Sequence, residues 1–116
     1  MKIKRFEQSA RMSQASQSGN LLVLSGQVSS GKTVTEQAES LLKNIDDLLE
    51  RAGTDKSNVI YANIFLTDMD DYEAFNQVWD KWVASEQGQV PSRAAIQVVR
   101  LASPDWVVEV QVFARA

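Results

Sequence analysis

Four stretches of the chain carry the patterns of apolar and polar residues that are typical of β-strands. They are residues 21–28, 59–66, 93–101 and 106–114. Gly19 and Asn20 favour a hairpin turn before the first stretch, so residues near 5–6 and 12–15 are also expected to be extended. The last two stretches, joined by residues 102–105, are expected to pair as a hairpin.

Two other stretches repeat their apolar residues every three or four positions, as amphipathic helices do. In the first, Thr33 and Glu36 have the spacing of a capping box, and Gly53 is placed to end the helix. The second follows the acidic caps of residues 68–71 and stops at Gln87-Gly88. The apolar positions of the two helices are Leu41, Leu42, Ile45, Leu48, Leu49 and Ala52, then Tyr72, Phe75, Trp79, Trp82 and Val83.

The order of strands and helices predicts an α+β fold, a mixed sheet with both helices on one face. The face under the helices is expected to hold Ile60, Ala62, Ile64 and Leu66 with Trp106, Val108, Val110, Val112 and Ala114. The opposite face is expected to hold Tyr61, Asn63, Phe65, Arg93, Gln97, Val99, Val107, Glu109, Gln111 and Phe113. Because this second face is half apolar, we expect another copy of the chain to cover it.

Composition narrows the chemistry that the chain can perform. Its 116 residues fit one domain, residues 1–116, and they include neither His nor Cys. Histidine triads, thiol nucleophiles and His or Cys metal sites are therefore excluded, and no metal site is expected. The net charge of -3 argues against nucleic acid as a partner. No apolar run fits a membrane span or a signal peptide, and the absence of Cys suits a reducing compartment, so we expect a cytoplasmic protein.

Residues 26–33 match the phosphate-binding pattern G-x4-G-K-T between a strand and a helix. In that interpretation Lys32 contacts the terminal phosphates of a nucleotide and Thr33 holds magnesium. The chain is short for a doubly wound parallel sheet and offers only two helices. We favour the alternative, a polar turn in which Lys32 is solvated and Thr33 caps the helix.

Arg93 and Glu109 are the strongest candidates for chemistry. A guanidinium at the start of a strand can hold a carboxylate with two parallel hydrogen bonds. Burial disfavours the charged form of Glu109, and a carboxylate tuned in this way can deprotonate water. The alternatives are a surface arginine, a purely structural ion pair and a subunit contact. Asn76 interrupts the apolar stripe of the second helix and either binds a ligand or bonds the backbone.

Several short segments, in their order and spacing, resemble the YjgF/RidA (RutC-like) family nearly from end to end. They are residues 24–28, 36–37, 42–45, 49–53, 67–72, 76–79, 91–93 and 108–110. Residues 11–15 and 80–83 resemble the YoaB-like branch more than the founding RidA branch. The resemblance implies a chorismate-mutase-like fold, a six-stranded sheet backed by two helices. It also implies a homotrimer whose sheets pack inward around a barrel.

The resemblance further implies a cofactor-independent enamine/imine deaminase that hydrolyses 2-imino acids to 2-keto acids and ammonia. The ligand would lie in clefts between subunits, with its carboxylate on Arg93 and the attacking water on Glu109. Backbone groups around Ala95, with Ser25, Gly26, Asn76 and Met12, would complete the pocket. Founding members have a tyrosine where Met12 stands and a cysteine where Ala95 stands. The alternative function is a non-catalytic module of the same fold that binds small carboxylates or protein partners.

Overall fold

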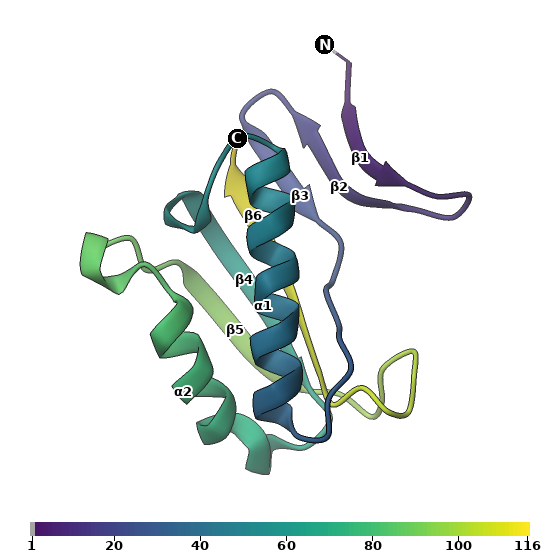
Figure 1. The fold of residues 1–116 in the computed structure, drawn as a ribbon, viewed down its shortest axis with the longest axis vertical. Coiled ribbons are helices and arrows are strands. Elements are labelled where there is room, and N and C mark those ends of the chain that lie inside the picture. Colours follow the sequence, from purple (N-terminus) through teal and green to yellow (C-terminus); the bar gives the residue numbers. More distant parts are fainter. Residues whose placement is uncertain (1) are drawn as a thin grey trace.

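The structure, a computed structural model, describes residues 2–116 as one six-stranded sheet with two helices on one face (Figure 1). The strands are β1 (Lys4–Gln8), β2 (Ser13–Ser18), β3 (Leu21–Leu24), β4 (Val59–Leu66), β5 (Ser92–Gln97) and β6 (Val108–Arg115). The helices are α1 (Val34–Arg51) and α2 (Tyr72–Trp82), with short 3₁₀ turns at Lys56–Asn58, Met69–Asp71 and Ser85–Gln87. The predicted α+β class, with a mixed six-stranded sheet and two helices, is confirmed.

Three of the four helix boundaries follow the predicted signals. The exception is the end of α2, which was expected at Gln87-Gly88: the helix ends at Trp82, because Val83 is extended, and Ser85–Gln87 form a separate 3₁₀ turn. The Thr33 side chain accepts a hydrogen bond of 3.2 Å from the Glu36 backbone N–H, which satisfies one of the free donors at the start of α1. Gly53 has a φ of 81° just after α1, a left-handed conformation that glycine adopts without steric cost. Asp68 caps the turn that leads into α2 by accepting from the backbone N–H of Asp70.

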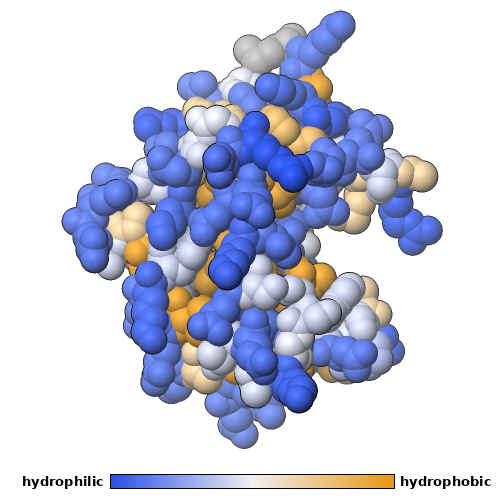
Figure 2. All heavy atoms as spheres, in the orientation of Figure 1, coloured by the Kyte–Doolittle hydropathy of each residue, from blue (hydrophilic) through white to orange (hydrophobic). Residues whose placement is uncertain are grey.

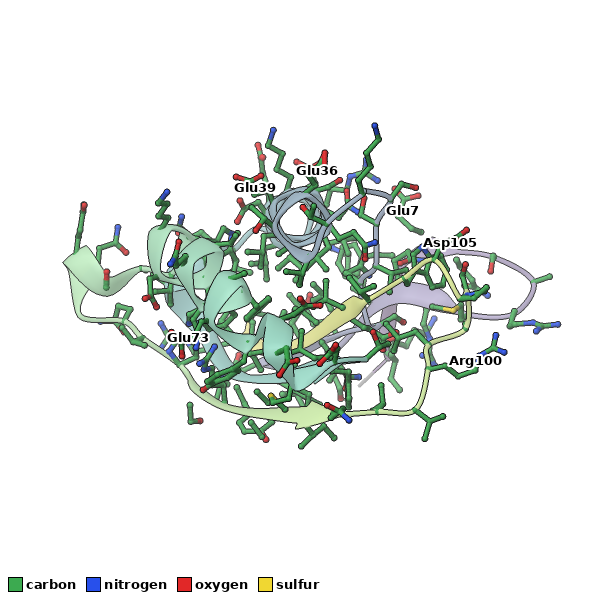
Figure 3. The ribbon with its side chains drawn as sticks, turned by 90° about the horizontal axis from the view of Figure 1, so that it is seen from below. Glu7, Glu36, Glu39, Glu73, Arg100 and Asp105 are labelled. Atoms are coloured by element: carbon green, nitrogen blue, oxygen red, sulfur yellow. The ribbon has the colours of Figure 1, made fainter. Side chains whose placement is uncertain are left out.

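The core lies between the helices and the face of the sheet beneath them (Figure 3). Glu36 and Glu39 point from α1 to solvent, on the side away from the sheet. Phe75 of α2 is fully buried, and Ala62, Ile64 and Leu66 of β4 meet the helices as predicted. On β6 the same holds for the alternate positions Val108, Val110, Val112 and Ala114.

The predicted closing hairpin is wrong. β5 pairs with β4 in a parallel arrangement, and β6 lies on the other side of β4, between β4 and β3. Parallel neighbours need a long crossover connection, and α2 provides it between β4 and β5. The chain thus contains one βαβ unit, which places β5 at the edge of the sheet, against α2 (Figure 1).

The new register changes the predicted face of Arg93 and Gln97. Arg93 pairs with Ala62, and Gln97 pairs with Leu66, so both lie on the helix side of the sheet and not on the open side. Ile60 was expected under the helices, but an irregularity in the β4–β6 pairing between Val59 and Tyr61 turns it outward, and it is 53% exposed.

Three predicted strands are shorter than expected. The first ends at Leu24 rather than at residue 28, although Gln27 still exchanges backbone hydrogen bonds with Val110. The strand from Arg93 ends at Gln97, so Val99 lies in the following loop, where it is 98% exposed. The last strand begins at Val108, which leaves Trp106 and Val107 before it. Local patterns of apolar residues do not mark where a partner strand stops.

Candidate functional site

Arg93 reaches from β5 to the inner side of α2. Its Nη2 atom donates to Asn76 Oδ1 at 2.7 Å and to Tyr72 Oη at 3.2 Å. The guanidinium carbon lies 5.3 Å from the ring centre of Trp79 and 5.8 Å from that of Tyr72, within the range of cation–π attraction. These four residues are called the arginine half-site below.

The arginine half-site leaves one nitrogen of Arg93 unused. Nη1 is buried and has no hydrogen-bond partner among residues 2–116. A buried donor without a partner costs free energy, and the cost is larger for a charged group. An arginine held in this way is therefore suited to receive an anionic oxygen from a molecule outside the chain.

Glu109 lies on the open face of the sheet. It pairs with Phe65 across β4 and β6, and the Phe65 side chain is itself only half covered. Burial of the carboxylate raises the pKa of Glu109 above its ordinary value of 4.5. A group with a raised pKa accepts a proton from water more readily than an ordinary glutamate does, which suits a general base.

The loop after β3 lies directly against Glu109. A Cβ atom on Gly26 would lie 2.7 Å from the Cδ atom of Glu109, so only glycine leaves room for the carboxylate in this position. The Ser25 hydroxyl donates to the backbone carbonyl of Ser13 at 2.7 Å, which holds the loop against β2. Glu109, Gly26 and Ser25 are called the glutamate half-site below.

Within one chain the two half-sites do not meet. Arg93 lies on the helix face of the sheet and Glu109 on the open face, with β4 between their strands. Two strand spacings separate them across the sheet, roughly 10 Å, in addition to the opposite directions of the side chains. The one ion pair between side chains of residues 2–116 joins Arg51 and Glu7 and so involves neither Arg93 nor Glu109.

The other three predicted site residues are Asn76, Ala95 and Met12, and only Asn76 is part of a half-site. Asn76 belongs to the arginine half-site, where its carbonyl oxygen accepts from Arg93 and does not bond the backbone. Ala95 lies two residues after Arg93 on β5 and packs against the core. Met12 lies in the turn between β1 and β2, next to Ser13, and is 43% exposed.

Tyr72 and Trp79 were predicted as core residues, yet both contact the guanidinium. Trp79 is buried as expected, whereas Tyr72 is half buried and directs its hydroxyl to Arg93. The signal was available in the sequence, because positions 72, 76 and 79 lie on one face of a helix. It was missed because the partner strand of α2 was not known to be β5.

The segment that matches the phosphate-binding pattern serves two parts of the structure, the surroundings of Glu109 and the start of α1. Gly26 makes room for Glu109, while Thr33 caps α1 and Lys32 is exposed. A Cβ atom on Gly31 would lie 2.9 Å from the backbone nitrogen of Gln37, so this glycine permits close packing against α1. Each of the two glycines thus has a packing reason that does not involve a phosphate.

A groove of 690 Å³ lies between α1 and α2, remote from Glu109. Leu42, Val78 and Trp82 line it together with charged residues, and Figure 2 shows hydrophobic residues between the two helices with hydrophilic ones around them. The Trp82 indole N–H donates to Asp46 at 3.0 Å, and desolvation raises the pKa of that aspartate.

Across residues 2–116, no cluster of three acidic side chains is arranged to bind a metal. In the same part of the chain, no helix has the length and apolar content to span a membrane.

Comparison with known proteins supplies relatives for the whole chain. The profile of the family described as Endoribonuclease L-PSP matches residues 2–116. A RutC family protein of Haemophilus influenzae is 42% identical over 98% of both chains, and the RutC family protein YoaB of Escherichia coli is 35% identical over 98% of both chains. A mouse protein named 2-iminobutanoate/2-iminopropanoate deaminase is 38% identical over 77% of this chain and 70% of its own length.

Solved structures agree with these relatives. The crystal structure of a YjgF family member from Neisseria meningitidis has a TM-score of 0.94 and 42% sequence identity, over 99% of this chain and 95% of that chain. The sheet and both helices are thus arranged as in a crystallographically determined fold.

Proposed function

Because the chain belongs to the endoribonuclease L-PSP family, also known as YjgF/RidA or RutC, and to its YoaB-like branch, we propose that it is an imine deaminase. The substrates would be 2-imino acids, formed for example from 2-aminoacrylate, and the products 2-keto acids and ammonia. The mouse relative's name supports this reaction class. The observation that carries the proposal is the buried, unpartnered Nη1 of Arg93, which is suited to a carboxylate oxygen.

The proposed reaction needs an acid-binding group and a water-activating group beside one C=N bond. Arg93 would hold the substrate carboxylate, and Glu109 would take a proton from a water molecule. The water oxygen would then attack the imine carbon, and the imine nitrogen would gain the proton held by Glu109, which gives an adduct with OH and NH2 on the same carbon. Transfer of the hydroxyl proton to that nitrogen would break the C–N bond, so ammonia leaves, the carbon becomes a carbonyl, and neither a redox change nor a cofactor is required. General base help contributes about 10²–10⁴-fold to such a step.

A site of this kind requires more than one copy of the chain. Since Arg93 and Glu109 lie on opposite faces of the sheet, one chain cannot bring both to a single small ligand. We therefore place the arginine half-site of one subunit against the glutamate half-site of a neighbour, in a cytoplasmic homotrimer. The open face supports this arrangement, because Tyr61, Phe65 and Phe113 give it half-covered aromatic surface that a neighbour could bury.

The description of the family names an endoribonuclease, but this chain has little that favours RNA as a substrate. The net charge is -3, whereas proteins that bind nucleic acids usually present a basic face. The sequence also lacks histidine, the side chain most often used for general acid–base catalysis. Small 2-imino acids therefore fit the residues of the two half-sites better.

A coupled assay tests the proposed function. An amino-acid oxidase would generate a panel of 2-imino acids in situ, and release of the 2-keto acids would be followed with and without the purified protein. We expect hydrolysis to be faster than the spontaneous rate. Rates equal to the spontaneous rate for every imine, together with thermal stabilisation by small carboxylates, would favour the non-catalytic binding module instead.

A further inference from the structure

The guanidinium of Arg93 has five N–H donors, and its nitrogens differ in whether they have hydrogen-bond partners within the chain. Nη1 and Nη2 each carry two hydrogens, and Nε carries one. Nη2 bonds both Asn76 and Tyr72, so its two hydrogens are engaged inside the chain. Nη1 is buried without a partner among residues 2–116. The group is therefore tied to α2 at one nitrogen and free at another.

This pattern limits how Arg93 can hold a carboxylate. Two parallel hydrogen bonds to a carboxylate come from neighbouring nitrogens, either Nη1 with Nη2 or Nε with Nη2. Both pairs contain Nη2, whose hydrogens are already engaged by Tyr72 and Asn76. As the side chains stand, Nη1 is covered and neither pair of nitrogens is free for a ligand, so a two-point grip requires that one bond to α2 be given up.

We propose that Tyr72 is a specificity-determining residue that competes with the ligand carboxylate for Nη2 of Arg93. This inference rests on the proposed function, in which Arg93 binds the substrate carboxylate. Of the two bonds to Nη2, that to Tyr72 is the longer, at 3.2 Å against 2.7 Å, and it ends on a neutral hydroxyl. The Tyr72 bond is therefore the one that a charged carboxylate displaces, while Asn76 keeps the guanidinium in place.

The aromatic rings keep the guanidinium in position when that bond is lost. The ring centres of Trp79 and Tyr72 lie 5.3 Å and 5.8 Å from the guanidinium carbon, and these contacts do not depend on the Tyr72 hydroxyl. Removal of the hydroxyl alone is thus expected to release one hydrogen of Nη2 without releasing Arg93 from α2. A purely structural role for Tyr72 predicts the opposite, a looser Arg93 and weaker binding.

The test is calorimetric binding of pyruvate, the simplest 2-keto acid, to the wild-type protein and to two variants. Tyr72→Phe keeps the ring, and we expect pyruvate to bind about tenfold more tightly, as for one hydrogen bond gained to a charged group. Asn76→Asp places a permanent carboxylate on Nη2, and we expect pyruvate to bind at least about tenfold more weakly. Methyl pyruvate, which lacks the charged carboxylate, serves as the control ligand and should not respond to Tyr72→Phe.

The outcomes separate this inference from the proposed function. Unchanged or weaker pyruvate binding in Tyr72→Phe, with binding lost in Arg93→Ala, overturns the role of Tyr72 alone. Pyruvate binding that survives Arg93→Ala overturns the proposed carboxylate clamp itself. If Tyr72→Phe does not fold, the side-chain NMR signals of wild-type Arg93 decide the matter. Hindered Nη2 protons, released on addition of pyruvate, support competition, and protons that rotate freely without ligand overturn it.

Discussion

The arginine and glutamate half-sites differ in how much of their surroundings one chain supplies. Around Arg93 the chain provides two hydrogen-bond acceptors and two aromatic rings, all from α2. Around Glu109 it provides a glycine that makes room and a half-covered sheet face, and burial raises the pKa of the carboxylate. Packing of α2 against β5 thus positions Arg93, whereas Glu109 occupies space that is available because Gly26 has no side chain.

The difference shows how one fold can use separate half-sites to bind a ligand and to react with it. Packing between α2 and β5 belongs to the core, so the direction of Arg93 is stabilised together with the fold. The Glu109 face is open in a single chain, so its final environment depends on what covers it. Substitutions in the two half-sites should accordingly differ in effect, and three of them, with a fourth at Lys32 outside both half-sites, test the comparison.

Arg93→Ala is expected to have the largest effect. It removes the only group of the arginine half-site that carries a positive charge, so we expect kcat/KM for 2-imino acids to fall about a thousandfold, as for loss of one partner in a buried charge pair. The coupled assay measures this loss, and size-exclusion chromatography checks that assembly is unchanged. Keto-acid release at the wild-type rate would contradict the assignment of Arg93.

Glu109→Gln is expected to lower kcat about 100-fold while pyruvate binding stays within a few-fold of wild type, because the shape of the side chain is kept and only the base is lost. The pH profile sharpens the test. Glu109 is active when deprotonated and its pKa is raised, so wild-type activity should rise with pH through a value above 4.5. If Glu109 is the base, the ratio of the wild-type rate to the variant rate should rise with pH in the same range. A ratio that does not change with pH would contradict this role.

Gly26→Ala is expected to lower kcat about tenfold, a smaller loss, because the added methyl group displaces the Glu109 carboxylate without deleting it. Pyruvate binding through Arg93 should remain, since Gly26 lies on the other half-site. Calorimetry and the coupled assay on the same preparation measure both quantities. A parallel loss of binding and turnover would show that the half-sites are not independent.

Lys32→Ala is expected to change neither activity nor binding, because Lys32 is exposed and lies in neither half-site. The same variant tests the phosphate-binding alternative through thermal melts with ATP and magnesium. Stabilisation of the wild type by ATP that disappears in Lys32→Ala would restore that alternative.

Most of the fold could be predicted from the sequence because its signals are local. Apolar spacing identified both helices, Thr33 identified the start of α1, and Gly53 marked its end. Pairing of strands is not local, and this is where prediction failed. Nothing in residues 93–114 indicates that β5 pairs with β4 alone, so a hairpin between β5 and β6 was a reasonable but wrong expectation.

The same limit applies to the candidate site. Arg93, Glu109 and Asn76 were identified from residue types that are unusual in their surroundings, whereas Tyr72 resembles any other aromatic residue of a buried stripe. Its contact with Arg93 follows from the parallel crossover, which turns Arg93 toward α2. Ile60 is a smaller example, since an irregularity of the strand pairing reverses the direction that simple alternation predicts.

The placement of Arg93 and Glu109 on opposite sides of one sheet has a genetic consequence, because it allows two defective variants to complement each other. In the proposed trimer each subunit lends its arginine to one neighbour and its glutamate to the other. Two defective alleles, one lacking the guanidinium and one lacking the carboxylate, would then rescue each other when their products co-assemble. A mixed ring would contain a cleft that is wild type in both groups, although every subunit in that ring carries a lesion.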